Sequence, residues 1–363
     1  MLRIVHVDTG RELRGGQRQL LRLARGLRER GHRQLVVCPD GSALEWSARE
    51  EGFQVFDLPG HDLGRLNGIL QLRQKLLAEP SQILHAHDGR GQTISWLASL
   101  GLPVRRVASR RVTFLPEGVG RHRFIYTTTC HAVIAVSHFV RSMLLKAGVP
   151  GERIEVIQDG IEIPAQLPTP AERAAARARW NFGEQEFLVG HVGAFTPEKG
   201  QDVAVEAMRL LDDRLPNSRL VLVGNAPQDF RETLDGLPPA AAGRIKLLGE
   251  LEDLSEFFAA LDLFIMPSRA EGLGSAALLA MARGRAVVAS RVGGLPEIVD
   301  AGRSGWLVEP GSARELADAI FDAASDPVRL AKFGALARDR ACHFSNDIMV
   351  AKTEALYERL LNH

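Results

Sequence analysis

Short apolar runs alternate along the whole chain with stretches whose apolar residues recur at helical spacing. In residues 16–30, Leu20, Leu23 and Leu27 fall on one helical face, and Gly31 follows as a stop signal. The apolar runs on either side are only a few residues long, which is typical of buried strands. Strands that alternate with helices predict parallel sheets with helices on both faces.

The expected strands form two successive sets. The first set comprises residues 4–7, 35–38, 53–58, 83–87, 104–109 and 132–137. The second set comprises residues 187–192, 220–223, 245–248, 263–266 and 286–290. Between the sets, Pro164, Pro168 and Pro170 accompany residues 163–169. Because proline fixes φ and lacks an amide donor, this stretch indicates an interdomain linker.

The chain therefore predicts an α/β protein of two doubly wound, Rossmann-like parallel-sheet domains that face a cleft. The expected domains are residues 1–165 and 166–345, and the length of 363 residues suits two such cores better than one. Residues 346–363 follow as a C-terminal helix, expected to pack back toward the first domain. Doubly wound domains bind ligands at the carboxyl ends of their strands, so the loops there are the expected place for a ligand site.

Charge is divided unevenly between the two halves. Residues 1–165 carry 23 Lys and Arg against 16 Asp and Glu, a net +7, and residues 166–363 carry 22 against 28, a net −6. A basic half suits an anionic partner such as a phosphorylated glycolipid, a membrane surface or nucleotide phosphates. A solvated, arginine-rich surface explains the same numbers.

Several classes of protein are disfavoured by the sequence. The three cysteines, Cys38, Cys130 and Cys342, are far apart and show no C-x-x-C spacing, so neither a zinc site nor a disulfide framework is indicated. The N-terminus enters a strand directly, which disfavours a signal peptide. No apolar run approaches the ~18 residues of a membrane span. We expect a cytoplasmic protein, peripheral to the inner membrane face at most.

Two glycines open the first expected helix. Gly15 and Gly16 follow the first strand, and Arg11, Arg14 and Gln17 can reach the same strand-to-helix loop. Glycine lets backbone N–H groups approach a ligand closely, and a helix N-terminus favours phosphate. A plain turn is the simpler explanation of an isolated Gly-Gly pair, so the neighbouring residues are what favour a phosphate loop.

Two loops of the second domain carry complementary charges. Residues 190–200 leave a strand and enter a helix beside Lys199, whose ammonium can neutralise diphosphate oxygens. Residues 267–275 place Glu271 among glycines that expose backbone amides at a helix N-terminus. Amides suit phosphate, and a carboxylate suits sugar hydroxyls. A surface lysine and a helix-terminal carboxylate explain each feature alone, but three such loops at strand ends together favour a ligand site.

Ordered motifs run through the chain. The first half contains His6-Val7-Asp8-Thr9, Gly15-Gly16-Gln17-Arg18-Gln19, His85-Ala86-His87-Asp88, Ser109-Arg110-Arg111-Val112, Ile134-Ala135-Val136-Ser137 and Val156-Ile157-Gln158-Asp159-Gly160-Ile161. The second half contains Pro197-Glu198-Lys199-Gly200 and Glu271-Gly272-Leu273-Gly274. In this order and spacing they resemble a bacterial branch of glycosyltransferase family 4 over nearly the whole chain.

The resemblance implies a metal-independent, retaining GT-B glycosyltransferase without a cofactor, which moves a sugar from a nucleoside diphosphate sugar to an acceptor hydroxyl. It implies an acceptor domain at 1–165, a donor domain at 166–345, and Glu271, Lys199 and Arg111 as catalytic groups. The donor-binding residues it implies are Gly15, Gly16, Lys199, Glu271, Gly272, Leu273, Gly274, Ser275 and Leu279. Those on the acceptor or phosphate side are Gln17, His87, Arg110 and Arg111.

Three positions depart from the family pattern. Leu279 stands where a second glutamate holds the nucleotide ribose, and losing that contact weakens binding by ~1–3 kcal/mol. Ala194 stands where the family often has arginine, and Arg111 stands where many members have a histidine near the sugar. Arg110 and Arg111 either restore positive charge near the phosphates, bind an anionic acceptor, or serve as structural ion-pair partners.

The sequence supports one principal function and leaves two alternatives open. The principal function is sugar transfer in cell-envelope polysaccharide or lipopolysaccharide synthesis, with a glycan or glycolipid acceptor and no nucleic-acid partner. Leu279 and Ala194 favour the first alternative, a catalytically impaired GT-B scaffold or binding protein. The second alternative is a sugar-nucleotide epimerase. No G-x-G-x-x-G opens either domain, which disfavours a dehydrogenase.

Overall fold

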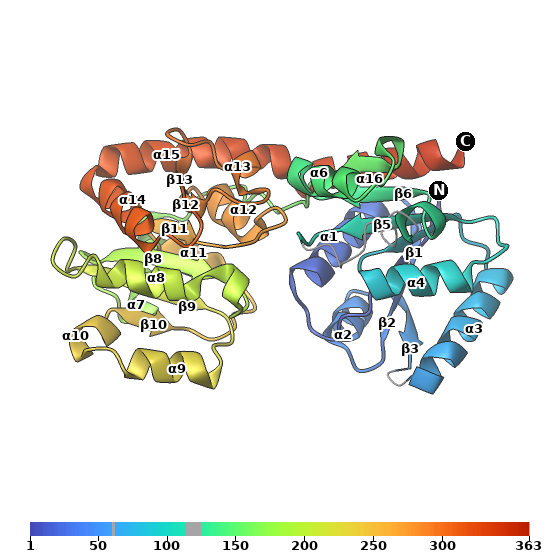
Figure 1. Cartoon of the computed structure of the whole chain (residues 1–363), viewed down its shortest axis with the longest axis horizontal. Coiled ribbons are helices and arrows are strands. Elements are labelled where there is room, and N and C mark those ends of the chain that lie inside the picture. Colours follow the sequence, from blue (N-terminus) through green and yellow to red (C-terminus); the bar gives the residue numbers. More distant parts are fainter. Residues whose placement is uncertain (60–61, 114–124, 363) are drawn as a thin grey trace. The chain divides into compact units, whose positions relative to one another are not determined.

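The computed structural model describes residues 1–59, 62–113 and 125–362. The chain divides into two compact units (Figure 1). The first unit is Met1–Gly160 together with Asn346–His363, and the second is Ile161–Ser345. The chain therefore leaves the first unit after Gly160, slightly before the expected boundary at residue 165, and returns to it after Ser345.

A seven-stranded parallel sheet forms the first unit, with strand order β3-β2-β1-β4-β5-β6-β7. Its strands are β1 (Arg3–Val7), β2 (Arg33–Pro39), β3 (Gln54–Leu58), β4 (Ile83–Ala86), β5 (Arg105–Arg110), β6 (Ala132–Ala135) and β7 (Ile154–Val156). Its helices are α1 (Gly15–Glu29), α2 (Ala43–Glu50), α3 (Asp62–Ala78), α4 (Gly89–Ala98), α6 (His138–Lys146), η1 (Gly151–Arg153) and α16 (Asn346–Leu361). The strand order reverses between β1 and β4, the point at which doubly wound sheets bind ligands.

The helix α1 confirms the predicted apolar face. Leu20, Leu23 and Leu27 are buried on it, and the helix gives way to Gly31 at φ 84°, a left-handed conformation that glycine adopts without strain.

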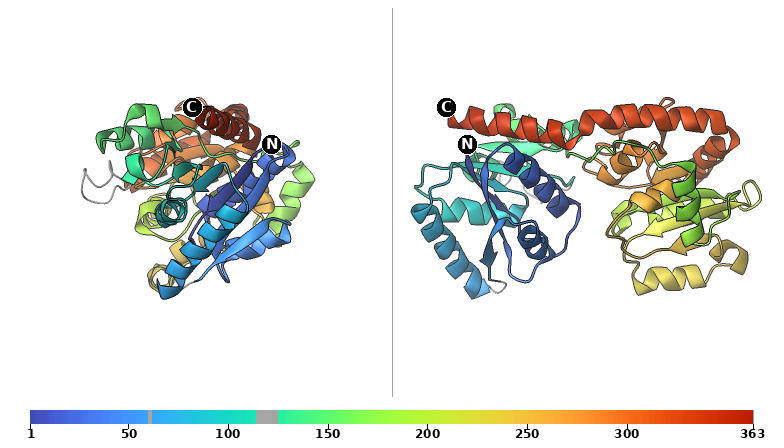
Figure 2. Two further views of the ribbon diagram at one scale, coloured as in Figure 1. Left: turned by 90° about the vertical axis from the view of Figure 1, so that its right-hand side faces the viewer. Right: turned by 180° about the vertical axis from the view of Figure 1, so that it is seen from behind.

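The C-terminal helix α16 belongs to the first unit and lies along α1 (Figure 2). Val350 and Tyr357 of α16 share an apolar cluster with Leu23 and Leu27 of α1. The two helices approach closely at Gly26, where an added Cβ would lie 2.5 Å from a Val350 methyl group. Only glycine fits at this contact, so the sequence of α1 is adapted to receive α16.

A six-stranded parallel sheet forms the second unit, with strand order β10-β9-β8-β11-β12-β13. Its strands are β8 (Phe187–Val192), β9 (Ser218–Val223), β10 (Ile245–Leu247), β11 (Leu263–Met266), β12 (Ala286–Ser290) and β13 (Gly305–Val308). Its longer helices are α7 (Pro170–Arg179), α8 (Gln201–Arg209), α9 (Gln228–Asp235), α12 (Ser275–Ala282), α14 (Ala313–Ser325) and α15 (Pro327–Ala341). Its shorter helices are η2 (Pro197–Lys199), α10 (Pro239–Ala242), α11 (Ser255–Ala260), α13 (Leu295–Ile298) and η3 (Cys342–Phe344).

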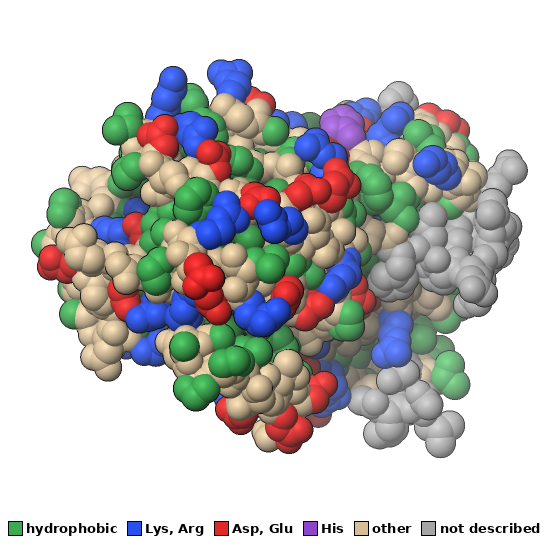
Figure 3. Space-filling view, turned by 60° about the vertical axis from the view of Figure 1, so that its left-hand side comes forward, with side chains coloured by type: hydrophobic (Ala, Val, Ile, Leu, Met, Phe, Trp, Pro, Cys, Tyr) green, Lys and Arg blue, Asp and Glu red, His purple; other side chains and the backbone are tan. Residues whose placement is uncertain are grey.

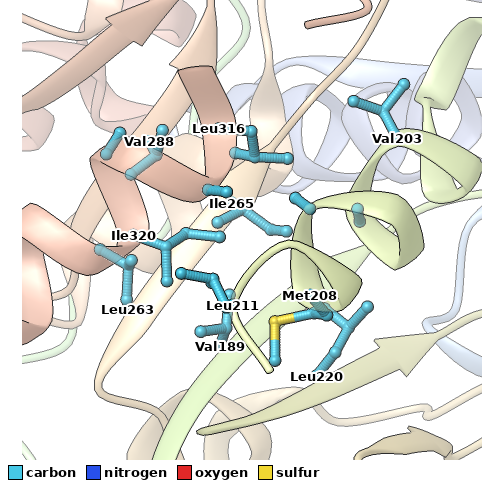
Figure 4. Packing of buried hydrophobic residues seen from close by; sticks show 14 of the residues in the cluster. Val189, Val203, Met208, Leu211, Leu220, Leu263, Ile265, Val288, Leu316 and Ile320 are labelled. Atoms are coloured by element: carbon cyan, nitrogen blue, oxygen red, sulfur yellow. The ribbon is translucent and has the colours of Figure 1, made fainter. Parts of the chain in front are cut away.

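An apolar core fixes one face of this sheet. Met208 of α8 and Ile320 of α14 pack with Val189, Leu263 and Val288 of three adjacent strands (Figure 4). Each of these side chains is at most 2% exposed. Because neighbouring strands are held in fixed register by this packing, the loops at their carboxyl ends are held in place as well.

The structure confirms two doubly wound parallel sheets and adds two strands that the sequence analysis missed. Both β7 and β13 lie at an edge of their sheet and have only three and four residues. Edge strands bury less apolar surface than central ones, so their sequences carry a weaker signal. Each missed strand extends a sheet whose central strands the apolar pattern had located.

Acidic and basic side chains are interspersed on the face shown in Figure 3. Exposed pairs of the second unit include Arg269 with Asp202 at 2.5 Å and Arg214 with Asp318 at 2.6 Å. Such exposed pairs contribute little stability, ~0–1 kcal/mol each. Among the described helices, none combines the length and apolarity that crossing a membrane requires.

Candidate active site

The loop of the second unit that carries Lys199 follows β8, the strand beside the reversal of strand order. It runs through η2 and ends at Gly200, whose φ of 71° is left-handed. An added Cβ at Gly200 would lie 2.1 Å from the Pro267 carbonyl oxygen, so glycine allows this loop to press against the residue after β11. The contact brings Lys199 beside the loop that carries Glu271.

Lys199 and Glu271 form an ion pair. The Lys199 Nζ atom donates to Glu271 Oε2 at 2.6 Å, and the two side chains are 26% and 12% exposed. From the sequence, one group was expected on diphosphate and the other on sugar, and the structure joins the two directly. The contact uses one Lys199 hydrogen and one Glu271 oxygen, so both groups keep further hydrogen-bonding capacity for a ligand.

The backbone of Glu271 is clamped by the turn that follows β12. Gly294 N donates to the Glu271 carbonyl at 3.2 Å. Gly293 has φ 59°, and an added Cβ there would lie 1.7 Å from the same oxygen. A glycine at 293 is therefore a condition for the position of Glu271.

The segment after Glu271 leads into the N-terminus of α12. Gly272, Leu273 and Gly274 are buried, and Ser275 is the first helical residue. Gly274 has φ 106°, and no side chain caps the helix. Among the described residues, no side chain accepts from the first-turn amides of α12, which makes them a favourable place for an anion. Leu279 lies one turn further on and is half-buried.

The glycine loop of the first unit opens α1 after β1. At both Gly15 and Gly16 an added Cβ would meet no atom within 4 Å, so their backbone faces open space. The side chain of Gln17 hydrogen-bonds neighbouring residues: its Oε1 accepts from Arg14 N at 3.1 Å and its Nε2 donates to Asp8 Oδ1 at 2.8 Å. Gln17 therefore holds the helix end to the strand end.

Two carboxylates lie at the ends of the adjacent strands β1 and β4. Asp8 accepts from Gly10 N at 2.8 Å, and Asp88 accepts from Thr9 N at 2.8 Å. Burial raises the pKa of Asp8, and the neighbouring charge of Asp88 raises it further. Neither carboxylate was expected from the sequence to take part in a ligand site, although Asp8 directly follows β1 and Asp88 lies two residues beyond β4.

Arg111 lies one residue beyond β5 and is anchored twice. Its Nε donates to Asp159 Oδ1 at 3.0 Å, and its Nη1 donates to His87 Nδ1 at 3.3 Å. The Arg111 and Asp159 side chains are only 14% and 9% exposed. The preceding residue, Arg110, hydrogen-bonds Tyr126. Asp159 had been quoted in a motif but given no role, and the structure makes it the partner of Arg111.

Both halves of the chain match known families. Residues 13–163 match "Glycosyltransferase Family 4", and residues 186–326 match "Glycosyl transferases group 1". A GDP-mannose-dependent alpha-(1-6)-phosphatidylinositol monomannoside mannosyltransferase from Mycolicibacterium smegmatis is 29% identical over 352 residues, covering 90% of each chain. The chain belongs to glycosyltransferase family 4.

Two further relatives agree with this assignment. The D-inositol 3-phosphate glycosyltransferase of Thermobispora bispora is 28% identical, with 84% of this chain and 77% of the relative covered. The crystal structure of Anabaena Alr3699/HepE in complex with UDP-glucose has a TM-score of 0.87 at 25% identity, covering 99% of this chain and all of that one. The expected GT-B fold is thereby confirmed, and the protein is a glycosyltransferase.

In this family 4 glycosyltransferase, the departure Ala194 lies in the loop after β8, and the departure Leu279 lies in helix α12. Ala194 is exposed, and its carbonyl accepts from Gln201 Nε2 at 2.9 Å. Leu279 presents an aliphatic side chain on α12, in the helix that follows Glu271. Neither side chain offers a charge or a hydrogen bond.

Proposed function

We propose that this glycosyltransferase moves a sugar from a nucleoside diphosphate sugar to an acceptor hydroxyl with retention of anomeric configuration and without a metal. The pairing of Lys199 with Glu271 beside the uncapped α12 N-terminus carries this proposal. A cation, a carboxylate and free amides are together the groups that a sugar diphosphate requires.

In the proposed reaction, the incoming diphosphate takes Lys199 away from Glu271. Lys199 and the amides of Leu273, Gly274 and Ser275 then bind the phosphates, and Glu271 accepts hydrogen bonds from hydroxyls of the donor sugar. As the glycosidic oxygen departs, negative charge develops on the diphosphate, where the ammonium and the helix N-terminus stabilise it. The acceptor hydroxyl attacks from the leaving-group side and gives its proton to the departing phosphate.

We assign the acceptor and further phosphate contacts to the first unit. The open backbone at Gly15 and Gly16 supports a phosphate contact, and Arg111 presents a held guanidinium at the carboxyl edge of the sheet. The mannosyltransferase and inositol phosphate glycosyltransferase relatives support a phosphorylated or lipid-linked acceptor in the cell envelope. We propose lipopolysaccharide or envelope polysaccharide synthesis as the pathway class.

Thermal stabilisation by a panel of nucleotide sugars tests the donor. A ligand that binds only the folded state raises the melting temperature, by an amount that depends on its concentration relative to Kd. We expect stabilisation by one nucleoside diphosphate sugar, unchanged when EDTA is added. No stabilisation by any member would contradict the donor proposal, and a requirement for a divalent ion would contradict metal independence.

The position of Leu279 favours one alternative function, a GT-B protein that binds a nucleotide sugar without turnover. The aliphatic side chain cannot hold the ribose diol, so donor affinity is reduced at this site. The same panel, followed by product analysis, separates the functions. Binding without transfer or hydrolysis supports the binding protein, transfer supports the enzyme, and an epimeric nucleotide sugar supports the epimerase.

We also propose that the basic first unit contacts an anionic membrane from the cytoplasmic side. Residues 1–165 carry the net charge of +7. Co-sedimentation with liposomes should require acidic lipid and weaken as salt is added, because exposed charges are screened. Equal binding to neutral liposomes, or no binding to either kind, would contradict a charge-driven contact.

A further inference from the structure

Three histidines are buried together at the carboxyl edge of β1 and β4. His6, His85 and His87 each offer a ring nitrogen, and these atoms all lie within 4.8 Å of one another. Burial lowers the pKa of His6 to about 4 and holds the pKa of the other two well below the ordinary value. Three neutral imidazoles in contact can hold a metal ion, or they can form part of a hydrogen-bond network.

Donor and acceptor can be assigned in each hydrogen bond of the cluster that leads away from Arg111. A guanidinium can only donate, so His87 Nδ1 must accept from Arg111 Nη1 at 3.3 Å. Neutral His87 therefore carries its proton on Nε2 and donates it to His6 Nδ1 at 3.1 Å. Neutral His6 then carries its proton on Nε2, which lies 2.9 Å from Gln34 Oε1.

The other end of this series of hydrogen bonds, at Gln34, gives the same direction independently. Gln34 Nε2 lies 2.7 Å from the Ala24 carbonyl oxygen, which can only accept, so the amide nitrogen must face Ala24 and the amide oxygen must face His6. The oxygen then requires a donor from His6 Nε2. Both ends thus place the protons of His6 and His87 on Nε2, and every link has one donor and one acceptor.

This consistency favours the network over a metal. Both ring nitrogens of His6 and of His87 already have partners, and an ion would have to displace them.

We propose that His87 and His6 are positioning residues that act through Arg111 and hold its guanidinium ready for a phosphate group of a substrate. The proposal rests on the proposed function of Arg111. Asp159 takes Nε of Arg111 and His87 takes one proton of Nη1. Within the described part of the chain, Nη2 is left for an anion. His87, expected from the sequence on the acceptor or phosphate side, is 5% exposed and contacts Arg111.

The series of hydrogen bonds from Arg111 through His87 and His6 to Gln34 fixes the orientation of the guanidinium plane. Asp159 alone leaves Arg111 able to rotate about Nε, and His87 provides the second point that prevents this rotation. His85 is the internal comparison. It is buried, and its ring centroid lies 4.1 Å from that of His87. However, it hydrogen-bonds Tyr357 and Ser109 and is not part of the series that ends at Arg111.

The first test is the tautomeric state of His6 and His87, read from long-range ¹H–¹⁵N correlations in histidine-labelled full-length protein without substrate. We expect both rings to be neutral with the proton on Nε2 near pH 7, and we expect the Arg111→Met variant to shift the Nδ1 resonance of His87. A proton on Nδ1 of either ring, a charged ring, or zinc that copurifies in stoichiometric amount would overturn the proposal. The result does not depend on which sugar is transferred.

The second test is a double-mutant cycle on turnover of the nucleotide sugar that gives the largest thermal shift. His87→Phe should lower kcat/KM by up to about 10²-fold, as expected when a catalytic group is misplaced. In an Arg111→Met background the same change should cost less than roughly twofold, because the group it positions is gone. His85→Phe, which loses two hydrogen bonds of the same kind, should have equal effects in both backgrounds. Equal effects of His87→Phe in both backgrounds would show a merely structural role.

Discussion

The two units hold their charged groups in different ways. In the second unit, Lys199 is paired with Glu271, and among the described residues no side chain caps the neighbouring N-terminus of α12. In the first unit, Arg111 is also paired with a carboxylate, Asp159, but its guanidinium has a second contact in the neutral ring of His87. We therefore expect the singly held Lys199 to rearrange when a charged ligand binds, and the doubly held Arg111 to stay in place.

The largest effect is expected from removing either member of the ion pair. Glu271→Ala and Lys199→Ala should each lower transfer by at least ~10²-fold while the protein stays folded, because each removes a charge that acts on the diphosphate or the sugar. Asp202→Asn is the matched control, since it breaks the exposed Arg269–Asp202 pair nearby. Near-normal turnover in either alanine variant would remove the pair from the active site.

A somewhat smaller effect is expected from moving the backbone of Glu271. Gly293→Ala places a Cβ on the Glu271 carbonyl, so it should weaken donor binding by about tenfold or more through misplacement of the carboxylate. Gly311→Ala is the control, because Gly311 has a similar left-handed φ of 80° with open space around it. Calorimetric titration of both variants gives the comparison. Equal affinities would mean that the clamp does not position Glu271.

The position of Leu279 tests whether the second unit still recognises a ribose. Leu279→Glu should tighten nucleotide binding by ~1–2 kcal/mol, about tenfold, through charge-assisted hydrogen bonds to the diol. Leu279→Met keeps the apolar volume and should leave affinity unchanged. If the pocket is adapted to leucine, the glutamate instead lowers the melting temperature, because an unpaired carboxylate is buried. Unchanged affinity with unchanged stability would place the nucleotide away from this residue.

The smallest effect is expected at Asp8. Because the folded state raises the pKa of this carboxyl, its ionised form destabilises the fold above that pKa, and the penalty disappears below the ordinary value of 3.8. Asp8→Asn keeps an oxygen for Gly10 and Gln17 but removes the charge beside Asp88. The melting temperature should rise at neutral pH, and the gain should vanish toward pH 3. A gain that is independent of pH would contradict this origin.

Strand and helix periodicity was enough to predict the two sheets, because most residues of their central strands are apolar. The loops that carry Lys199 and Glu271 were found for the same reason, since they follow apolar strands directly. The partners inside the site were not predictable. Nothing in the sequence indicates that Gln34 lies beside His6, or that Asp159 lies beside Arg111. These pairs arise from strand order, which brings distant segments to one edge.

The return of α16 to the first unit affects how the protein is made. Val350 and Tyr357 belong to the core of the first unit but are synthesised after the whole of the second unit. Domains generally fold as units during synthesis, in order from the N-terminus. Here the second unit emerges from the ribosome complete, while the first still lacks the helix that covers α1 and the hydroxyl that bonds His85. A nascent chain stalled before residue 346 should therefore expose an unfinished first unit to chaperones and proteases.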